Sequence, residues 1–141
     1  MPTYLLDTNI FLRILSGLDS DQKGECELLL RKVEKGNIKV VVPNLVLSEI
    51  VWTLTSYYRH SKQEIVNAVK SILNIANIKF VDGYDIFLGM TFFEKKSVKY
   101  IDSLIASIDE VQKKRWIVIS YDKDFDKLGV KRLEPKDLKI R

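Results

Sequence analysis

Short hydrophobic runs, each ended by a polar or turn-forming residue, predict the strands of a sheet. Residues 3–6 and 116–120 each lead into an aspartate, and residues 38–42 are followed by Pro43, which has no N–H for a strand ladder. Two weaker candidates are residues 79–81 and 130–133. Apolar runs that alternate with helical stretches are typical of strands covered on both faces. The pattern therefore predicts an α/β sandwich around a parallel sheet.

Hydrophobic positions at helical spacing predict the covering helices. The clearest begins at Ser61, where Ser61 and Glu64 form a capping-box pattern ahead of a stripe of Ile65, Val69, Ile72 and Ala76. A second stripe should end at Gly36, because glycine often terminates helices. That stripe and three more are Cys26/Leu29/Leu30/Val33, Val46/Ile50/Leu54/Tyr57, Ile86/Met90/Phe93 and Leu104/Ile108/Val111. No repeat or long linker interrupts them, so we expect one domain over residues 1–141.

Composition narrows the class of protein. The chain has 141 residues with one cysteine and one histidine, which excludes an internal disulfide framework and a cysteine- or histidine-rich zinc site. Cys26 lies in an apolar stripe and is expected in the core, whereas His60 precedes a helix cap and is expected near the surface. No apolar run approaches the ~20 residues of a membrane span, and the first residues do not begin a signal peptide. We expect a soluble, cytoplasmic protein.

The net charge is weakly informative. Lys and Arg exceed Asp and Glu by 23 to 19, giving +4 and a pI of about 9.1. A basic surface favours contact with phosphates, but an ordinary lysine-rich surface gives the same value.

Carboxylates are the remaining candidates for chemistry. The chain lacks the glycine-rich phosphate loops and a Gly-x-Ser-x-Gly elbow. Asp7 and Asp122 follow predicted strands, and ligands of open α/β sheets bind outside the carboxyl ends of strands. Glu49 and Asp102 lie in helical patterns among apolar neighbours, where an unpaired carboxylate is costly to bury. Taken singly, Asp7 and Asp122 are better explained as caps or turn residues, whereas Glu49 and Asp102 fit a site and a satisfied structural position equally well.

Considered together, these acids predict a metal site. Two unit charges ~5 Å apart at an effective dielectric constant near 20 repel by roughly 3 kcal/mol. Converging carboxylates would therefore destabilise the fold unless they were protonated or bound a cation. Ligand sets made only of oxygen suit Mg²⁺ or Mn²⁺, and such ions promote phosphoryl displacement. The hypothesis is a nuclease, on condition that the four acids converge.

Four short motifs resemble the successive acidic motifs of PIN domains. Their acids, Asp7, Glu49, Asp102 and Asp122, occur in that family's order, separated by 42, 53 and 20 residues. The motifs are Leu6-Asp7-Thr8-Asn9-Ile10-Phe11-Leu12, Ser48-Glu49-Ile50, Tyr100-Ile101-Asp102-Ser103-Leu104-Ile105-Ala106 and Ile119-Ser120-Tyr121-Asp122-Lys123-Asp124-Phe125. The resemblance spans nearly the whole chain. It departs from the family pattern at Ser120, where a threonine is usual, and this change keeps the hydroxyl.

The resemblance implies a Rossmann-like three-layer sandwich and a Mg²⁺- or Mn²⁺-dependent ribonuclease that cleaves RNA internally. By position, the metal ligands would be Asp7, Glu49, Asp102 and Asp122, with Asp124 a further candidate. Thr8, Asn9 and Ser120 would orient them by hydrogen bonds. Stand-alone PIN domains of this size are most often VapC-type toxins of toxin–antitoxin pairs, which are typically homodimers silenced by a small antitoxin.

Other interpretations remain open at this point. The chain could be a housekeeping RNA-processing nuclease, or a non-catalytic RNA- or partner-binding module whose acids are caps. Candidate phosphate contacts, chosen for their proximity to the motifs, are Arg13, Arg59 and Lys123. Six aromatic residues exceed the needs of a small core: Trp52, Tyr57, Tyr58, Phe87, Phe92 and Phe93. We expect most of them in the core and a few at a dimer or antitoxin surface.

Overall fold

A computed structural model describes residues 2–138 and contains a parallel five-stranded sheet. In these residues the strand order is β3-β2-β1-β4-β5, and every neighbouring pair is parallel. The strands are β1 (Thr3–Leu6), β2 (Lys39–Pro43), β3 (Ile78–Val81), β4 (Trp116–Ile119) and β5 (Arg132–Leu133). All five predicted strands are confirmed, although β5 is shorter than expected. Pro43 closes β2 opposite Val81 and does not lie beyond its end.

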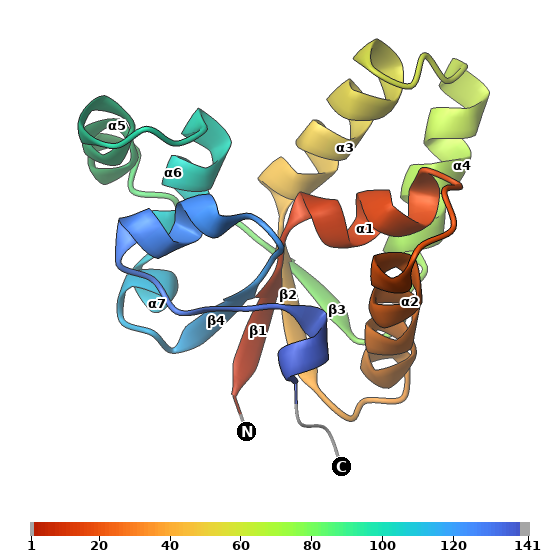
Figure 1. Ribbon diagram of the computed structural model, residues 1–141, viewed down its shortest axis with the longest axis horizontal. Helices are drawn as coiled ribbons and strands as arrows, with labels where there is room; N and C mark the ends of the chain where they lie inside the picture. Colours follow the sequence, from red (N-terminus) through yellow and green to blue (C-terminus); the bar gives the residue numbers. More distant parts are fainter. Residues whose placement is uncertain (1, 139–141) are drawn as a thin grey trace.

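Helices cover both faces of this sheet, which confirms the predicted three-layer sandwich. In Figure 1, α1 to α4 lie on one side of the strands and α5 to α7 on the other. The first group is α1 (Thr8–Leu15), α2 (Asp21–Glu34), α3 (Asn44–Ser56) and α4 (Lys62–Leu73). The second is α5 (Ile86–Lys95), α6 (Tyr100–Ala106) and α7 (Asp109–Gln112). Two 3₁₀ helices follow in the chain: η1 (Lys123–Leu128) contacts α6, and η2 (Pro135–Asp137) contacts α2. None of the helices within residues 2–138 could span a membrane.

The predicted helix ends are largely confirmed. Ser61 and Glu64 form the reciprocal capping box of α4, with backbone-to-side-chain distances of 2.9 and 3.2 Å. Gly36 follows α2 with φ of 75°, a left-handed conformation that glycine adopts without a steric penalty. Ala76 lies beyond the end of α4, so it does not extend the stripe. Cys26 is buried in the core, as expected.

The stripe of Leu104, Ile108 and Val111 does not form one helix. The first helix, α6, ends at Ala106, and Ile108 is an extended residue (φ −62°, ψ 129°) that begins α7. The break has a physical cause at Ser107, whose Oγ donates to the Leu104 carbonyl at 2.6 Å and accepts from the Asp85 N–H at 3.0 Å. Such local side-chain bonds compete with helix continuation. The stripe residues are nevertheless all buried.

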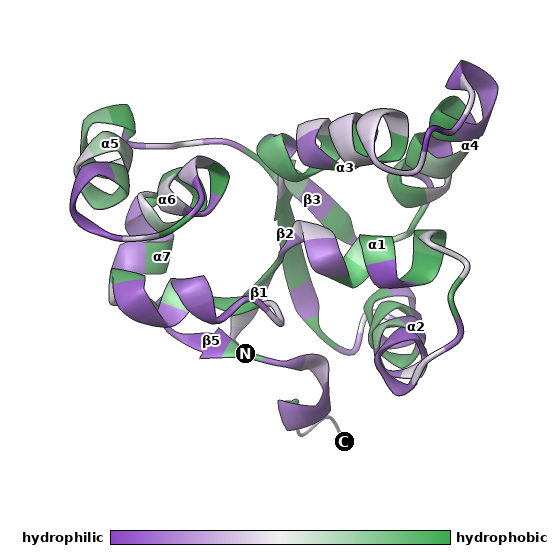
Figure 2. Cartoon of the chain, turned by 45° about the horizontal axis from the view of Figure 1, so that its top comes forward, coloured by the Kyte–Doolittle hydropathy of each residue, from purple (hydrophilic) through white to green (hydrophobic). Residues whose placement is uncertain are grey.

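The helix predicted from Ile86, Met90 and Phe93 exists as α5, but its apolar stripe faces outward. These three side chains are exposed, and Figure 2 shows hydrophobic colouring on α5 at the edge of the molecule. The buried side of α5 is Gly89, where a Cβ would lie 2.9 Å from Leu104 Cδ2. A Cβ at residue 89 would therefore displace the Leu104 side chain, and with Gly89 packed on α6 the apolar stripe faces away from the core.

This outward placement corrects the expectation that most of the six aromatics belong to the core. Four of the six are exposed: Trp52, Tyr57, Phe87 and Phe93. Tyr58 and Phe92 are half-buried and pack against the core. The fully buried aromatic side chains are Phe11 and Phe125, which lie next to the acidic motifs.

Candidate metal centre and active site

The first acidic motif lies where the strand order reverses. Strands β1 and β4 are parallel neighbours with Leu6 opposite Ile119, and the Asp7 N–H donates to the Ile119 carbonyl at 3.1 Å. The chain leaves β1 for α1 on one side and leaves β4 for η1 on the other. Open α/β sheets bind ligands at such a position, because the loops separate there.

A small hydrogen-bond network fixes one oxygen of Asp7. Ser120 Oγ donates to Asp7 Oδ2 at 2.7 Å, and Asn9 Nδ2 donates to Ser120 Oγ at 3.1 Å. The other oxygen, Oδ1, is buried without a hydrogen-bond partner. Ser120 and Asn9 thus both hydrogen-bond to Asp7 Oδ2, Asn9 at 3.4 Å. Thr8 contributes only its backbone, because its buried hydroxyl is unpaired.

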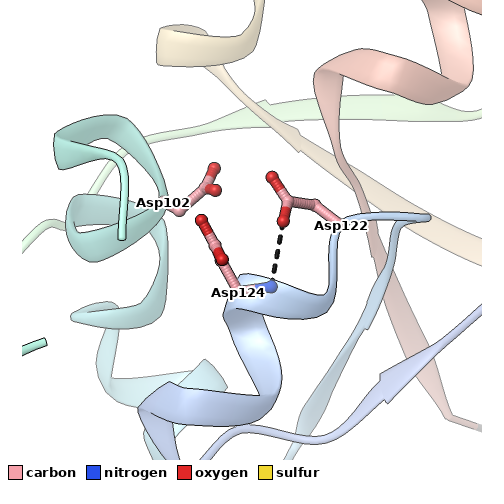
Figure 3. A group of neighbouring side chains, drawn as sticks. All are labelled: Asp102, Asp122 and Asp124. Atoms are coloured by element: carbon pink, nitrogen blue, oxygen red, sulfur yellow. Dashed lines mark hydrogen bonds between the residues drawn. The ribbon is translucent and has the colours of Figure 1, made fainter. Parts of the chain in front are cut away.

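Three carboxylates converge beside this network. Oxygens of Asp102, Asp122 and Asp124 lie within 4.8 Å of one another, and Figure 3 shows the side chains pointing toward a common centre from α6, from the loop after β4 and from the start of η1. Asp122 is held by its Oδ1, which accepts from the Asp124 N–H at 2.9 Å, and by its own N–H, which donates to Ser120 Oγ at 3.0 Å. Ser120 therefore connects Asp7 to this trio.

Glu49 faces the same region from α3. With Asp7, Asn9 and Lys99 it lines a cavity of about 270 Å³. The structure thus brings all four predicted acids and Asp124 to one end of the sheet, in two parts. Asp102, Asp122 and Asp124 form the tight trio, while Asp7 and Glu49 line the adjoining cavity.

Sequence reasoning missed Lys99, the cation that joins the two parts. Its Nζ lies 3.0 Å from Asp122 Oδ2 and 3.9 Å from Asp102 Oδ2, and its side chain borders the cavity. The signal that could have found it was its position three residues before Asp102 at the start of a helix. Within the described chain Arg13 has other partners, since its Nε donates to Gln22 Oε1 at 2.6 Å. Arg59 and Lys123 are exposed.

Burial dominates the electrostatics of the acids. It raises the pKa of Asp7 to about 6, although the Ser120 hydrogen bond opposes the shift. Burial, reinforced by the charge of Asp7, raises the pKa of Asp102 to about 9. Burial would also raise the pKa of Asp122, but the Asp124 N–H and Lys99 lower it below its ordinary value. For Lys99, Asp102 and Asp122 overcome burial and raise the pKa of the ammonium.

These residues fit a divalent cation. Asp7 Oδ1 and both oxygens of Asp102 are buried without hydrogen bonds, and buried polar atoms in proteins are rarely left in that state. All the converging side-chain donors are carboxylate oxygens, which suit Mg²⁺ or Mn²⁺ better than Zn²⁺. Asp102 is only 1% exposed, so a cation would take the place of the proton that burial keeps on this carboxyl.

Comparison with known proteins identifies the family. The family model described as the PIN domain matches residues 4–131 of this chain. The chain belongs to the PIN domain family. The fold and the family expected from the acidic motifs are therefore confirmed.

Individual relatives cover nearly the full chain. A VapC ribonuclease from Aquifex aeolicus (strain VF5) is 27% identical over 93% of this chain and 96% of its own length. The solved structure of VapBC2 from Rickettsia felis, bound to a promoter DNA fragment, has 18% identity and a TM-score of 0.62, over 94% of this chain and 98% of that one. VapC20 from Mycobacterium tuberculosis, described as a sarcin–ricin-loop-cleaving toxin, has 17% identity and a TM-score of 0.64, over 90% of this chain and 95% of that one.

Replacing Asp102 with a residue that has no ionisable group should stabilise the metal-free protein. Its raised pKa means that the folded state keeps a proton that the unfolded chain has lost, so metal-free stability falls as pH rises from about 4 to about 9. We expect Asp102→Asn to raise the free energy of unfolding in EDTA by about 1–3 kcal/mol at pH 8 and by much less at pH 5. Denaturant melts at both pH values measure this, with the exposed Asp19→Asn as the control. An equal change in the free energy of unfolding at both pH values would contradict the raised pKa of Asp102.

Proposed function

We propose that this PIN domain is a divalent-metal-dependent endoribonuclease and the toxin of a toxin–antitoxin pair. The observation that carries the proposal is the carboxylate trio with unpaired buried oxygens, placed beside Asp7 at the strand switch point. The match to a VapC ribonuclease along 93% of the chain supports the enzyme class. Cleavage of RNA in the cytoplasm is the corresponding biological setting.

Asp7, Asp102 and Asp122 would hold the cation, with Asp124 and Glu49 as further oxygen donors. When bound, a divalent ion activates water and stabilises the charge that develops on a phosphate during displacement. Ser120 and Asn9 fix the orientation of Asp7, and the Asp124 N–H fixes Asp122. The cavity beside Glu49 leaves space for the phosphate of a substrate.

Neutralising one of the acids should remove activity without unfolding the protein. We expect Asp7→Asn to lower RNA cleavage in Mg²⁺ or Mn²⁺ by about 100-fold or more and to retain the fold by circular dichroism. EDTA should abolish cleavage by the unchanged protein. Asp109→Asn, on the exposed surface of α7, is the matched control and should stay active. Cleavage that persists in EDTA would exclude the metal-dependent mechanism.

Two other functions differ from the proposed one in measurable ways. A housekeeping RNA-processing nuclease would cleave RNA without arresting growth, whereas a toxin arrests growth on expression and is relieved by its antitoxin. A non-catalytic binding module would show no thermal stabilisation by Mn²⁺, whereas a bound ion at 100 times its Kd adds about 2.7 kcal/mol.

An apolar surface on α3 and α4 suits the antitoxin. A groove of about 560 Å³ lies between the helices. Its apolar lining residues are Val51, Ile65, Val66 and Val69, and Thr55, His60, Lys62 and Lys70 complete the lining. Val51 also borders a second hollow of about 480 Å³ beside Trp52, and Trp52 in turn lines the cavity of Asp7 and Glu49. The apolar surface therefore continues to the acidic site. An amphipathic helix fits such a groove, and a solved structure of similar fold from Klebsiella pneumoniae is a toxin–antitoxin complex.

A charge in this surface should disrupt antitoxin binding. We expect Val51→Asp to weaken binding of the cognate antitoxin by about 2 kcal/mol, or roughly thirtyfold in Kd, while leaving RNA cleavage by the free toxin unchanged. Isothermal titration calorimetry with the small protein encoded beside the gene measures this. Leu18→Asp makes the same chemical change at an exposed position between α1 and α2 and should bind normally. Equal binding by both variants would place the antitoxin elsewhere.

We also propose that the protein forms a homodimer, and the outward face of α5 supports this. Phe87 is 89% exposed, and Ile86, Met90 and Phe93 are exposed with it, so the helix presents a hydrophobic patch that water solvates poorly. We expect Phe87→Glu to convert a dimer into a monomer that keeps its fold, as measured by light scattering. Tyr57→Glu changes a comparably exposed aromatic at the end of α3 and should stay dimeric. A monomeric unchanged protein would exclude the dimer.

A further inference from the structure

Lys99 occupies a position that a catalytic cation would need. Its ammonium is 3.0 Å from Asp122 Oδ2 and 3.9 Å from Asp102 Oδ2, two members of the carboxylate trio. A divalent metal binds carboxylate oxygens at about 2.0–2.1 Å when it is Mg²⁺ and would carry twice the charge. The ammonium and the metal would then repel each other at short range, so both cannot hold these oxygens at once.

The ion pairs that Lys99 forms with Asp102 and Asp122 differ from an ordinary surface ion pair. The pair of Lys113 with Asp109, for example, joins two exposed side chains, and such pairs contribute little. Asp102 is almost fully buried, and neither of its oxygens has a hydrogen-bond partner. Among the described residues, the ammonium of Lys99 is the cation that lies within 4 Å of it.

The ammonium of Lys99 can also move away from the carboxylates. Its side chain is 60% exposed, so the ammonium can move into solvent without opening the core. Its backbone is fixed independently, because the Lys99 carbonyl accepts from the Ser103 N–H at 3.1 Å and from Ser103 Oγ at 3.2 Å. A swing of this side chain would therefore leave α6, and Asp102 on it, in place.

We propose that Lys99 is an internal countercation that competes with the catalytic metal and sets the affinity of the site. In the metal-free protein its ammonium pairs with Asp122 and lies beside Asp102, and the arriving cation displaces the ammonium into solvent. The lysine thereby lowers the affinity for metal and offsets the repulsion among the carboxylates of the metal-free protein. This inference rests on the proposed metal site and describes how that site is regulated.

The test is direct metal binding at constant pH, without RNA. We expect Lys99→Met, which keeps the aliphatic stem and removes the charge, to bind Mn²⁺ roughly tenfold more tightly by isothermal titration calorimetry. In EDTA the same variant should melt at a lower temperature than the unchanged protein, and Mn²⁺ should raise its Tm by more. Lys99→Arg keeps the charge and should bind metal no more tightly than the unchanged protein.

Two control variants separate this effect from a loss of net charge. Lys113→Met removes a lysine paired with Asp109 at the surface beside α7 and should leave Mn²⁺ affinity unchanged. Lys127 lies 3.3 Å from Asp124 Oδ1 and also contacts the Ser97 carbonyl. Lys127→Met should therefore increase the affinity for Mn²⁺ by less than Lys99→Met does.

The outcomes distinguish this inference from the proposed function. If the unchanged protein and Lys99→Met bind Mn²⁺ with equal affinity, the competition is refuted and the metal site stands. If neither protein binds Mn²⁺ or Mg²⁺, the proposed metal site and the competition both fail. Tighter binding by Lys99→Met with unchanged binding by Lys113→Met supports the inference.

Discussion

The parallel pairing of β1 with β4 is the constraint on which the site depends. It places Leu6 opposite Ile119, so the residues that follow, Asp7 and Ser120, meet although 113 positions separate them. Ser120 then bonds both to Asp7 and to the N–H of Asp122. A change of register by one residue would turn these side chains to the opposite face and would separate Asp7 from the trio.

Bringing these carboxylates together lowers the stability of the fold, and groups around them reduce this cost. Asp122 is partly exposed, and it receives a backbone N–H and a lysine ammonium. Asp102 is buried and receives no hydrogen bond, so burial raises its pKa to about 9. The acid that a cation would benefit most is therefore the one that the protein's own groups satisfy least. Active sites commonly retain such locally unfavourable arrangements because function requires them.

Sequence alone located the strands and the acids because both follow local rules. Apolar runs define β1 and β4, and the motif order identified the PIN family, which the family model confirms. Lys99 was missed because its partner Asp122 lies on another loop, and no helical pattern reveals that contact. The outward face of α5 was also missed, since periodicity shows that a stripe exists but does not show which side Gly89 buries. Long-range packing decided both features.

The proposed protein contacts involve helices that also position the site. Helix α3 presents Val51 and Trp52 to the apolar grooves and Glu49 to the acidic cavity. Helix α5 presents Phe87 outward and packs through Gly89 on Leu104, two residues from Asp102 in α6. A partner on α3 would cover the entrance to the cavity directly. A partner on α5 would instead restrain the packing that holds α6, so the two surfaces would act on the same acids by different physical routes.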